Sequence, residues 1–561
     1  MKFFLFAVLV CICGSVTSQA QSCLTPNDIK QLLARIQDAP ALSTPSPPNP
    51  ATPDPQAQPT PPPNLNKKLQ ADLIKMAQKQ QELLQQVVAE DQTKKSDQEK
   101  LHELYENNAV KLCELLKTNG WPTTATVDRE GVRATYYILK NSGTYEMQRD
   151  LLSVILAAIK KDPVQKPEFA GLYDRLRVSA GMKQVFGTQA VSMGGFLVLY
   201  PIEDEKHVDD RRAEFGLSTM ETNIRNLERN YARPLVKSRQ PPDRKVSKEL
   251  ADSLNRALDS SAIDGTYVDP GDVIKTETNL VSLNVSVFSN KSKMFVGGAL
   301  TKEDFKVLEN GQEQTISYFA STDVPFDLVL LIDLSGSTSD KRDLIKKSTL
   351  RFIETARPSD RLAIVTFSDA PTVVSPLTLD RAQLSASVAQ MTGMGGSHVW
   401  DAVKFALDKV LGPKTLERRR AVVLMSDGVD GALFRLGPAR GSVVTFADLI
   451  EQVRQNDTLI VPIYLDTEEA MGNPFTKTEY ENARRTLNLL AQESGGSYYK
   501  ARKLSDLNGV YEQVINDLGK VYSLGYKPTN PERDDSWRWV QISIPNRPDL
   551  VARSRPGYYA Q

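Results

Sequence analysis

The sequence of 561 residues predicts an α/β doubly wound domain, flanked by strands of a small β-sandwich and preceded by a mainly α-helical domain. Three patterns support this prediction. Apolar runs of strand length alternate with helical patterns within residues 325–525. Apolar and polar side chains alternate with a period of two on both sides of that range. From Leu65 onward, apolar residues recur at three- and four-residue steps, the spacing of amphipathic helices.

Residues 1–20 are predicted to be a secretory signal peptide. One lysine precedes an apolar run from Phe3 to Cys13, and small residues end at Ala20, which predicts cleavage there. The run is too short to span a membrane, and no later segment reaches the roughly 18 to 20 apolar residues of a membrane helix. We therefore expect an exported protein, periplasmic or secreted, with no transmembrane segment after cleavage.

Residues 21–64 are predicted to be a disordered segment rich in proline and threonine, because Pro40 to Asn64 cannot bury enough apolar surface to fold. After signal cleavage the remaining cysteines are Cys23 and Cys113. In an oxidising compartment they can form a disulfide. Two free thiols are the alternative, and the sequence leaves both open.

The overall composition argues against a nucleic-acid partner. The 69 lysines and arginines balance the 69 aspartates and glutamates, so the formal net charge is zero and no global field attracts phosphate. Little histidine is available for acid–base catalysis or for a histidine-rich zinc site. The three histidines are His102, His207 and His398.

Residues 65–235 are predicted to form the helical domain, with helical spacing over Leu65–Val88 and Leu101–Leu116. From about residue 107 to 230 the chain carries Gly-Trp-Pro-Thr, Phe-Gly-Thr-Gln and Pro-Ile-Glu-Asp stretches. This part resembles a bacterial domain family of unknown function. That family has a Gln-His-Ala-Asp-like stretch where this chain has Leu139-Lys140-Asn141-Ser142, so the two residues best suited to chemistry are missing.

An acidic cluster in the same domain admits two interpretations. It can form a carboxylate site, but lysine and arginine neighbours favour an internally paired, solvated surface. The cluster comprises Glu203, Asp204, Asp209 and Asp210.

The flanking β segments are expected to form one sandwich together, because neither contains enough strands alone. From Val281 to Val287 the alternation predicts a strand with one buried face. Asn310-Gly311 is a turn dipeptide typical of a hairpin. The expected boundaries are a linker with one helix (Ser247–Leu258) at 236–275, sandwich segments at 276–324 and 526–561, and the inserted α/β domain at 325–525.

Within the inserted domain, apolar runs predict strands that are buried on both faces of a mostly parallel sheet. The expected strands are Leu328–Ile332, Leu362–Thr366, Ala421–Met425 and Leu459–Leu465. The expected helices are Asp343–Thr355, Asp401–Leu411 and Phe446–Gln455.

Oxygen-bearing residues gather where these strands end. Asp333, Ser335 and Ser337 follow the first strand, Ser397 precedes a helix, and Asp427 ends a later strand. Ligands of open α/β sheets bind at the carboxyl ends of the strands, so these residues should converge. Two carboxylates and three hydroxyls suit Mg²⁺, with Mn²⁺ or Ca²⁺ as alternatives. Such an ion keeps part of its charge, and a carboxylate from a partner completes its shell.

The stretches Asp-Leu-Ser-Gly-Ser, Gly-Gly-Ser and Ser-Asp-Gly resemble the metal-ion-dependent adhesion site of von Willebrand factor type A (VWA) domains, over residues 326–501. The flanks resemble VWA-related proteins abundant in acidobacterial secretomes. The resemblance implies that Asp333, Ser335 and Ser337 form the first metal loop. It implies further that Ser397 forms the second loop and Asp427 the third. Ser397 replaces the usual threonine, and the lost methyl group should weaken metal binding somewhat.

Three neighbouring residues are interpreted without a metal role. Asp369 and Asp430 suit helix capping and turns. His398 is expected at the rim, because imidazole does not suit a hard site made of oxygen ligands.

These observations predict a non-enzymatic binding protein that captures a protein partner presenting an acidic side chain. Two rivals remain. The chain is a scaffold of the cell envelope whose metal only stabilises the loops, or it is a metal-assisted hydrolase with its activity in the N-terminal domain.

Overall fold

A computed structural model describes residues 23–39, 65–89, 95–142, 145–239, 254, 280–291, 294–297, 300–393, 395–411, 417–433, 441–468, 475–501 and 506–560. The expected signal peptide and the stretch Pro40 to Asn64 lie outside the described residues, as does the expected linker helix apart from Leu254. None of the described helices combines the length and the apolar character that a membrane span requires.

The chain divides into two compact units. The first comprises Met1–Ser192, Val198–Asn223 and Lys237–Pro270, and the second comprises Met193–Leu197, Ile224–Val236 and Gly271–Gln561.

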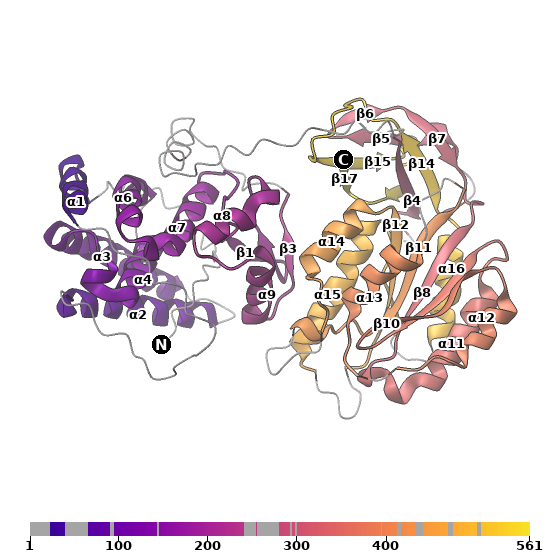
Figure 1. Ribbon diagram of the computed structural model, residues 1–561. Coiled ribbons are helices and arrows are strands. Elements are labelled where there is room, and N and C mark those ends of the chain that lie inside the picture. Colours follow the sequence, from indigo (N-terminus) through magenta and orange to yellow (C-terminus); the bar gives the residue numbers. More distant parts are fainter. Residues whose placement is uncertain are drawn as a thin grey trace. The chain divides into compact units, whose positions relative to one another are not determined.

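The N-terminal region is mainly helical, as the sequence predicts (Figure 1). Its first seven helices pack around one core, to which each contributes at least one buried apolar side chain. The helices are α1 (Pro26–Asp38), α2 (Lys67–Ala89), α3 (Lys95–Asn119), α4 (Thr124–Ser142), α5 (Tyr145–Asp150), α6 (Leu152–Lys161), α7 (Lys166–Ser179), α8 (Val208–Glu214) and α9 (Met220–Tyr231). A small sheet has the order β1-β2-β3, with strands Ala190–Met193, Phe196–Leu199 and Leu235–Lys237.

The expectation of disorder across residues 21–64 is wrong for α1. Thr25 and Asp28 form a capping box, in which each side chain accepts the backbone N–H of the other. Leu32 and Ile36, four residues apart, are buried. The proline-rich composition begins only at Pro40. The prediction extended it back to residue 21 and so overlooked α1, a capped amphipathic helix.

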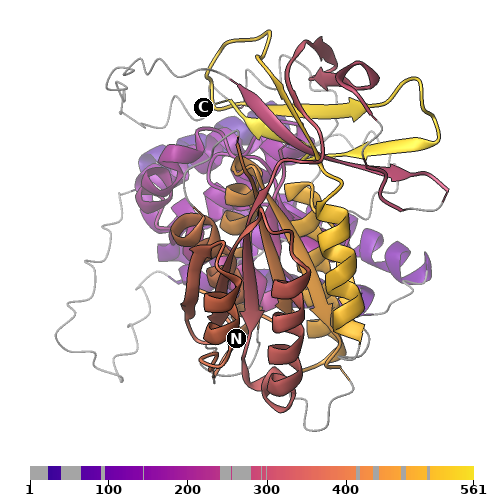
Figure 2. The same ribbon diagram turned by 90° about the vertical axis from the view of Figure 1, so that its right-hand side faces the viewer.

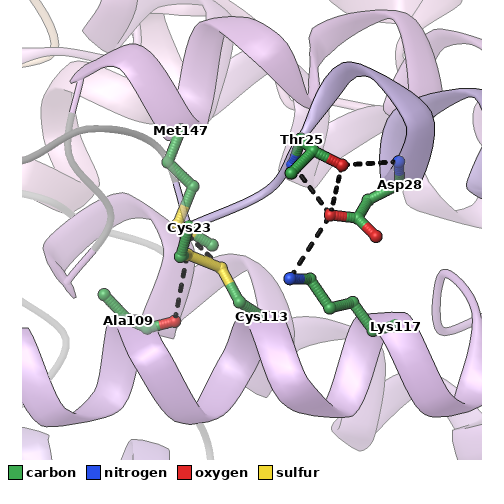
Figure 3. Close-up of a disulfide and its surroundings, with 7 residues drawn as sticks. All are labelled: Cys23, Thr25, Asp28, Ala109, Cys113, Lys117 and Met147. Carbon is green, nitrogen blue, oxygen red and sulfur yellow. Dashed lines mark hydrogen bonds and ion pairs between the residues drawn. A yellow bond between two sulfur atoms is a disulfide. The ribbon is translucent and has the colours of Figure 1, made fainter.

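A disulfide joins Cys23, just before α1, to Cys113 in α3 (Figure 3). The Sγ atom of each cysteine lies 3.9 Å from Sδ of Met147. Beside the disulfide, Lys117 Nζ lies 3.3 Å from the Asp28 carboxylate. The bond thus ties the first described residues to the helical core, and it resolves the alternative that the sequence left open.

The acidic cluster is a paired surface, as interpreted. Glu203 forms an ion pair with Arg177. Asp204 lies 3.3 Å from Arg211 Nη1 and 2.9 Å from His207 Nδ1. The Asp209 carboxylate accepts the backbone N–H at the start of α9 at 2.6 Å.

The C-terminal part contains an α/β domain built on a six-stranded sheet with the order β10-β9-β8-β11-β12-β13. The strands are β8 (Phe326–Asp333), β9 (Arg361–Phe367), β10 (Pro371–Thr378), β11 (Arg419–Ser426), β12 (Thr458–Leu465) and β13 (Tyr499–Ala501). All neighbours pair in parallel except β10, which is antiparallel to β9 at the edge. The four expected strands all form.

Helices cover both faces of this sheet (Figure 1). Leu328, Leu330 and Ile332 of β8 point into one layer, and Val329 and Leu331 point into the other. The first layer is covered by α11 (Arg342–Thr355), α12 (Arg381–Val388) and α16 (Leu507–Leu518). The second is covered by α13 (Val399–Phe405), α14 (Phe446–Gln455) and α15 (Lys477–Ser494). This arrangement confirms the doubly wound fold.

Strands from both flanks build two four-stranded sheets around one apolar core (Figure 2). One sheet has the order β16-β4-β14-β7, with strands Leu550–Arg553, Val281–Ser289, Tyr522–Tyr526 and Ile316–Ala320. The other has the order β17-β15-β5-β6, with strands Gly557–Tyr559, Trp537–Ser543, Lys306–Glu309 and Gln312–Gln314. The expected turn Asn310-Gly311 joins β5 to β6, with φ of 48° and 83°.

The expectation that β4 has only one buried face is wrong. Its polar residues are also buried, with Ser282 at 6% and Asn284 at 8% exposure. Both side chains donate hydrogen bonds to Asp457, at the start of β12. The polar face of β4 therefore packs against the α/β domain and is not exposed to solvent.

Candidate metal centre

The candidate residues lie at the carboxyl edge of the central sheet. Strands β8 and β11 are neighbours in parallel register, with Ile332 opposite Met425. Asp333 and Ser426 follow directly at the two strand ends. Because both strands point the same way, the loops that leave them share one edge, and the polar residues of these loops come together.

The first loop turns its oxygen atoms around the Asp333 carboxylate. The backbone N–H of Ser335 donates to Asp333 Oδ1 at 2.9 Å. The hydroxyls of Ser335 and Ser337 are 3.2 Å apart. Asp333 is fully buried, Ser335 is 2% exposed and Ser337 is half-buried. Exposure to solvent increases from Asp333 at the strand end to Ser337, so Ser337 is the most accessible of the three residues.

The second loop brings Ser397 to the same carboxylate. Its hydroxyl donates to Asp333 Oδ2 at 3.3 Å. The loop is held by the Gly336 N–H, which donates to the Gly395 carbonyl at 3.2 Å. Gly395 has φ of 120°, and a Cβ there would lie 2.1 Å from Asp369 Oδ2. Glycine is therefore required for the close approach of the loops.

The third loop adds the second carboxylate and two residues that the sequence did not single out. Ser426 donates to Asp333 Oδ2 at 2.6 Å and accepts the Gly428 N–H at 2.8 Å. The Asp427 carboxylate accepts the Thr467 hydroxyl at 3.0 Å. Ser426 belongs to the quoted Ser-Asp-Gly stretch but was not expected to contact Asp333, and Thr467 follows β12 without any motif around it.

The electrostatics of the site favour a positive ion. Burial, and then the charge of Asp427, raise the pKa of Asp333 to about 7. Its carboxylate pairs with no lysine or arginine among the described residues. Two facing carboxylates in a buried site repel each other unless a proton or a cation lies between them.

The donor set fits Mg²⁺. Oxygen atoms are the only donors, two of them carboxylates and three hydroxyls, which suits a hard cation that keeps several waters. The described residues contain no cluster of three or more histidine, cysteine, aspartate or glutamate side chains. The site is thus too poor in charge and in nitrogen or sulfur to suit zinc.

The neighbouring residues act as interpreted. Asp369 Oδ1 accepts the Gly396 N–H at 2.7 Å, which shapes the second loop. Asp430 accepts the Trp400 N–H at 3.1 Å in the first turn of α13, and two further N–H groups from its own loop. The His398 side chain is 15% exposed, and its Nδ1 lies 3.5 Å from the Asp401 carboxylate.

Comparisons with known proteins agree with this architecture. Residues 328–429 match the family described as von Willebrand factor type A domain, and residues 67–236 match a family of unknown function, DUF6624. No curated protein gives a significant match.

Two solved structures are similar to part of this chain at low identity. The vWF domain of the type V pili tip protein Mfa5 from Porphyromonas gingivalis is 15% identical, with 34% of this chain and 94% of that chain covered and a TM-score of 0.28. A von Willebrand factor type A protein from Catenulispora acidiphila is 14% identical, with coverages of 51% and 65% and a TM-score of 0.29. The C-terminal part of the chain therefore contains a VWA-like α/β domain, and the mainly helical N-terminal part matches a family of unknown function.

Proposed function

We propose that this chain is an exported binding protein that captures a protein partner through a bound Mg²⁺. Asp333, Ser335, Ser337, Ser397 and Asp427 would hold the ion, directly or through water. One observation carries the proposal. A fully buried carboxylate, Asp333, collects hydroxyls from the ends of two strands and from a third loop, beside a second carboxylate.

The ligand set explains why the ion would attract a partner. Two carboxylates at most neutralise Mg²⁺, and hydroxyls are weak neutral donors, so the ion stays an effective Lewis acid toward a further oxygen. Ser337, the most accessible of the first-loop residues, marks the open side of the site. A glutamate or aspartate of a partner supplies a charged oxygen there, which water does not.

An adhesion or interaction role also agrees with the VWA match of residues 328–429. The proposed export rests on the sequence of residues 1–20 alone. The proposal that the chain is not an enzyme rests on the absence of a nucleophile and base pair among the metal-loop residues.

Calorimetry tests the metal first. We expect the purified full chain to take up one Mg²⁺ or Mn²⁺, and Asp333→Ala to lose this uptake. Asp343→Ala is a matched control, because it removes an exposed carboxylate from α11 of the same domain. Wild-type protein that takes up neither ion would overturn the proposal.

Crosslinking with mass spectrometry in the native envelope tests the partner. We expect proteins crosslinked to the wild type and to Asp343→Ala to be lost from Asp333→Ala and from EDTA-treated samples. If Mg²⁺ raises the melting temperature while crosslinking ignores EDTA, the metal is structural and the scaffold interpretation holds instead.

A further inference from the structure

The helical unit contains a cavity of about 440 Å³ that the metal site does not involve. It lies between the first turns of α4, the start of α7 and the end of α8. The volume falls within the range of small-molecule sites, roughly 300 to 1,000 Å³. Its walls combine positively charged side chains with apolar ones, which is the composition of a site for an amphipathic ligand.

Three cationic side chains line the cavity: Arg129, Arg133 and Lys166. Arg129 and Arg133 are four residues apart on α4, so they share one face of the helix. Asp128 accepts the N–H groups of Glu130 and Gly131 and thereby restarts the helix after a kink, which fixes Arg129 in its first turn. The guanidinium of Arg129 is exposed and pairs with no carboxylate among the described residues.

The buried acid of the cavity holds one of these cations in place. Glu168 is 7% exposed at its side chain. Its carboxylate lies 3.5 Å from Arg133 Nε and 3.9 Å from the buried Lys140 Nζ. Burial raises the pKa of Glu168 and lowers that of Lys140. The Arg133 side chain is 46% exposed, so its head group borders the cavity while its Nε lies beside the buried Glu168 carboxylate.

The remaining wall is apolar. Val132 and Phe215 are 2% exposed and belong to the helical core, so their position is rigid. Lys166 Nζ lies 5.2 Å from the centre of the Phe215 ring and 3.6 Å from Glu214. The more accessible apolar residues of the cavity wall are Pro163, Val164 and Pro167, which are half-buried, so an apolar group of a ligand can rest against them while its charged group meets the arginines.

We propose that this cavity binds a small organic anion, with a carboxylate or phosphate held by Arg129 and Arg133 and an apolar body packed against Pro163, Val164 and Pro167. Counting Lys140 behind Glu168, four cations and two acids surround the space, so the local field favours an anion over a zwitterion or a cation. None of the metal-loop residues lines this cavity, so the proposal does not depend on metal binding.

Calorimetry on the full chain with four probes tests this proposal. Phenylacetate and phenyl phosphate carry the two candidate head groups on an apolar ring. Inorganic phosphate lacks the ring, and benzyl alcohol lacks the charge. We expect saturable binding of at least one organic anion, and much weaker binding of the two partial probes. Which organic anion binds more tightly identifies the head group.

Two arginine substitutions and a matched control complete the test. Arg129→Gln and Arg133→Gln should each weaken binding about tenfold, since each removes a charge-assisted contact. Arg149→Gln, a similarly exposed helical arginine outside the cavity, should bind like the wild type. Circular dichroism checks that each variant folds.

The proposal is overturned if neither organic anion binds, or if Arg129→Gln and Arg133→Gln bind as tightly as Arg149→Gln. Equal binding of benzyl alcohol would refute recognition of the charge. Equal binding of inorganic phosphate would refute recognition of the apolar body.

Discussion

The hydroxyl of Ser397 reaches Asp333 from a separate loop, and Ser397 stands where the sequence resemblance implies a threonine in the proposed metal site. Ser397→Thr keeps the hydroxyl and restricts its rotamer, so we expect Mg²⁺ affinity equal to or above that of the wild type. Ser397→Ala should weaken binding about tenfold. Calorimetry with Mg²⁺ measures both. An alanine variant with wild-type affinity would show that Ser397 takes no part in metal binding.

Asp333 also gives the metal-free protein a pH-dependent stability. Its pKa of about 7 lies above the value of about 3.9 for an unfolded chain. Between about pH 4 and about pH 7 the folded state therefore holds a proton that the unfolded chain has released, so the contribution of Asp333 to the free energy of unfolding falls as pH rises. Urea unfolding in EDTA should show a steeper fall with pH for the wild type than for Asp333→Asn. Parallel curves for the two proteins would contradict the prediction.

Among the individual site residues, those that form a regularly spaced motif could be predicted from the sequence. Asp333, Ser335 and Ser337 stand at alternate positions after an apolar strand, and such a pattern is visible locally. Thr467 lies in no such motif, and for Ser426 the quoted Ser-Asp-Gly stretch does not show that its hydroxyl contacts Asp333. Their roles depend on strand register and on a contact 40 residues away in sequence, between Thr467 and Asp427.

At the scale of elements, the disulfide between Cys23 and Cys113 closes a loop of 90 residues between the start of α1 and α3. Such a crosslink limits the freedom of the unfolded chain, so we expect Cys23→Ser/Cys113→Ser to lower the free energy of unfolding by about 3 to 5 kcal/mol. Urea unfolding of the oxidised protein, the reduced protein and the double variant measures this. Reduced wild type should behave like the variant. Equal stability of all three would show that the bond contributes nothing.

Elements with a strong local pattern were predictable. Strands β8, β9, β11 and β12 are apolar along their length because both faces are buried, and that pattern is visible in sequence. Edge strand β10 was missed because most of its residues are only partly buried. Helix α15 was missed because part of its buried face is polar, at Asn482, Thr486 and Ser494, which weakens the apolar pattern.

At the scale of the whole molecule, the sandwich depends on strands from both ends of the second unit. Removing residues 527–561 deletes β15, which pairs with β5, and β16, which pairs with β4. We expect the truncated chain to melt at a lower temperature and to expose the apolar core around Val285 and Val307. Thermal unfolding and binding of a hydrophobic dye measure the two effects. A truncated chain with an unchanged melting temperature would mean that the first flank folds without the last.

The route of the chain through the sandwich has a mechanical consequence. The chain enters the α/β domain after β7 and leaves it before β14, and these two strands are hydrogen-bonded neighbours. Arg419 of β11 donates to the Ser321 carbonyl, just after β7, at 2.6 Å and to the Ser523 hydroxyl, in β14, at 2.8 Å. It thus forms hydrogen bonds both where the chain enters the α/β domain and where it leaves it. Asp333 lies about 23 Å away, along the eight residues of β8. A pulling force on a partner bound at that far edge would act along the direction of the parallel strands. It would be shared between the two connections to β7 and β14. Their hydrogen bonds would then be loaded together, in shear, and not broken one after another.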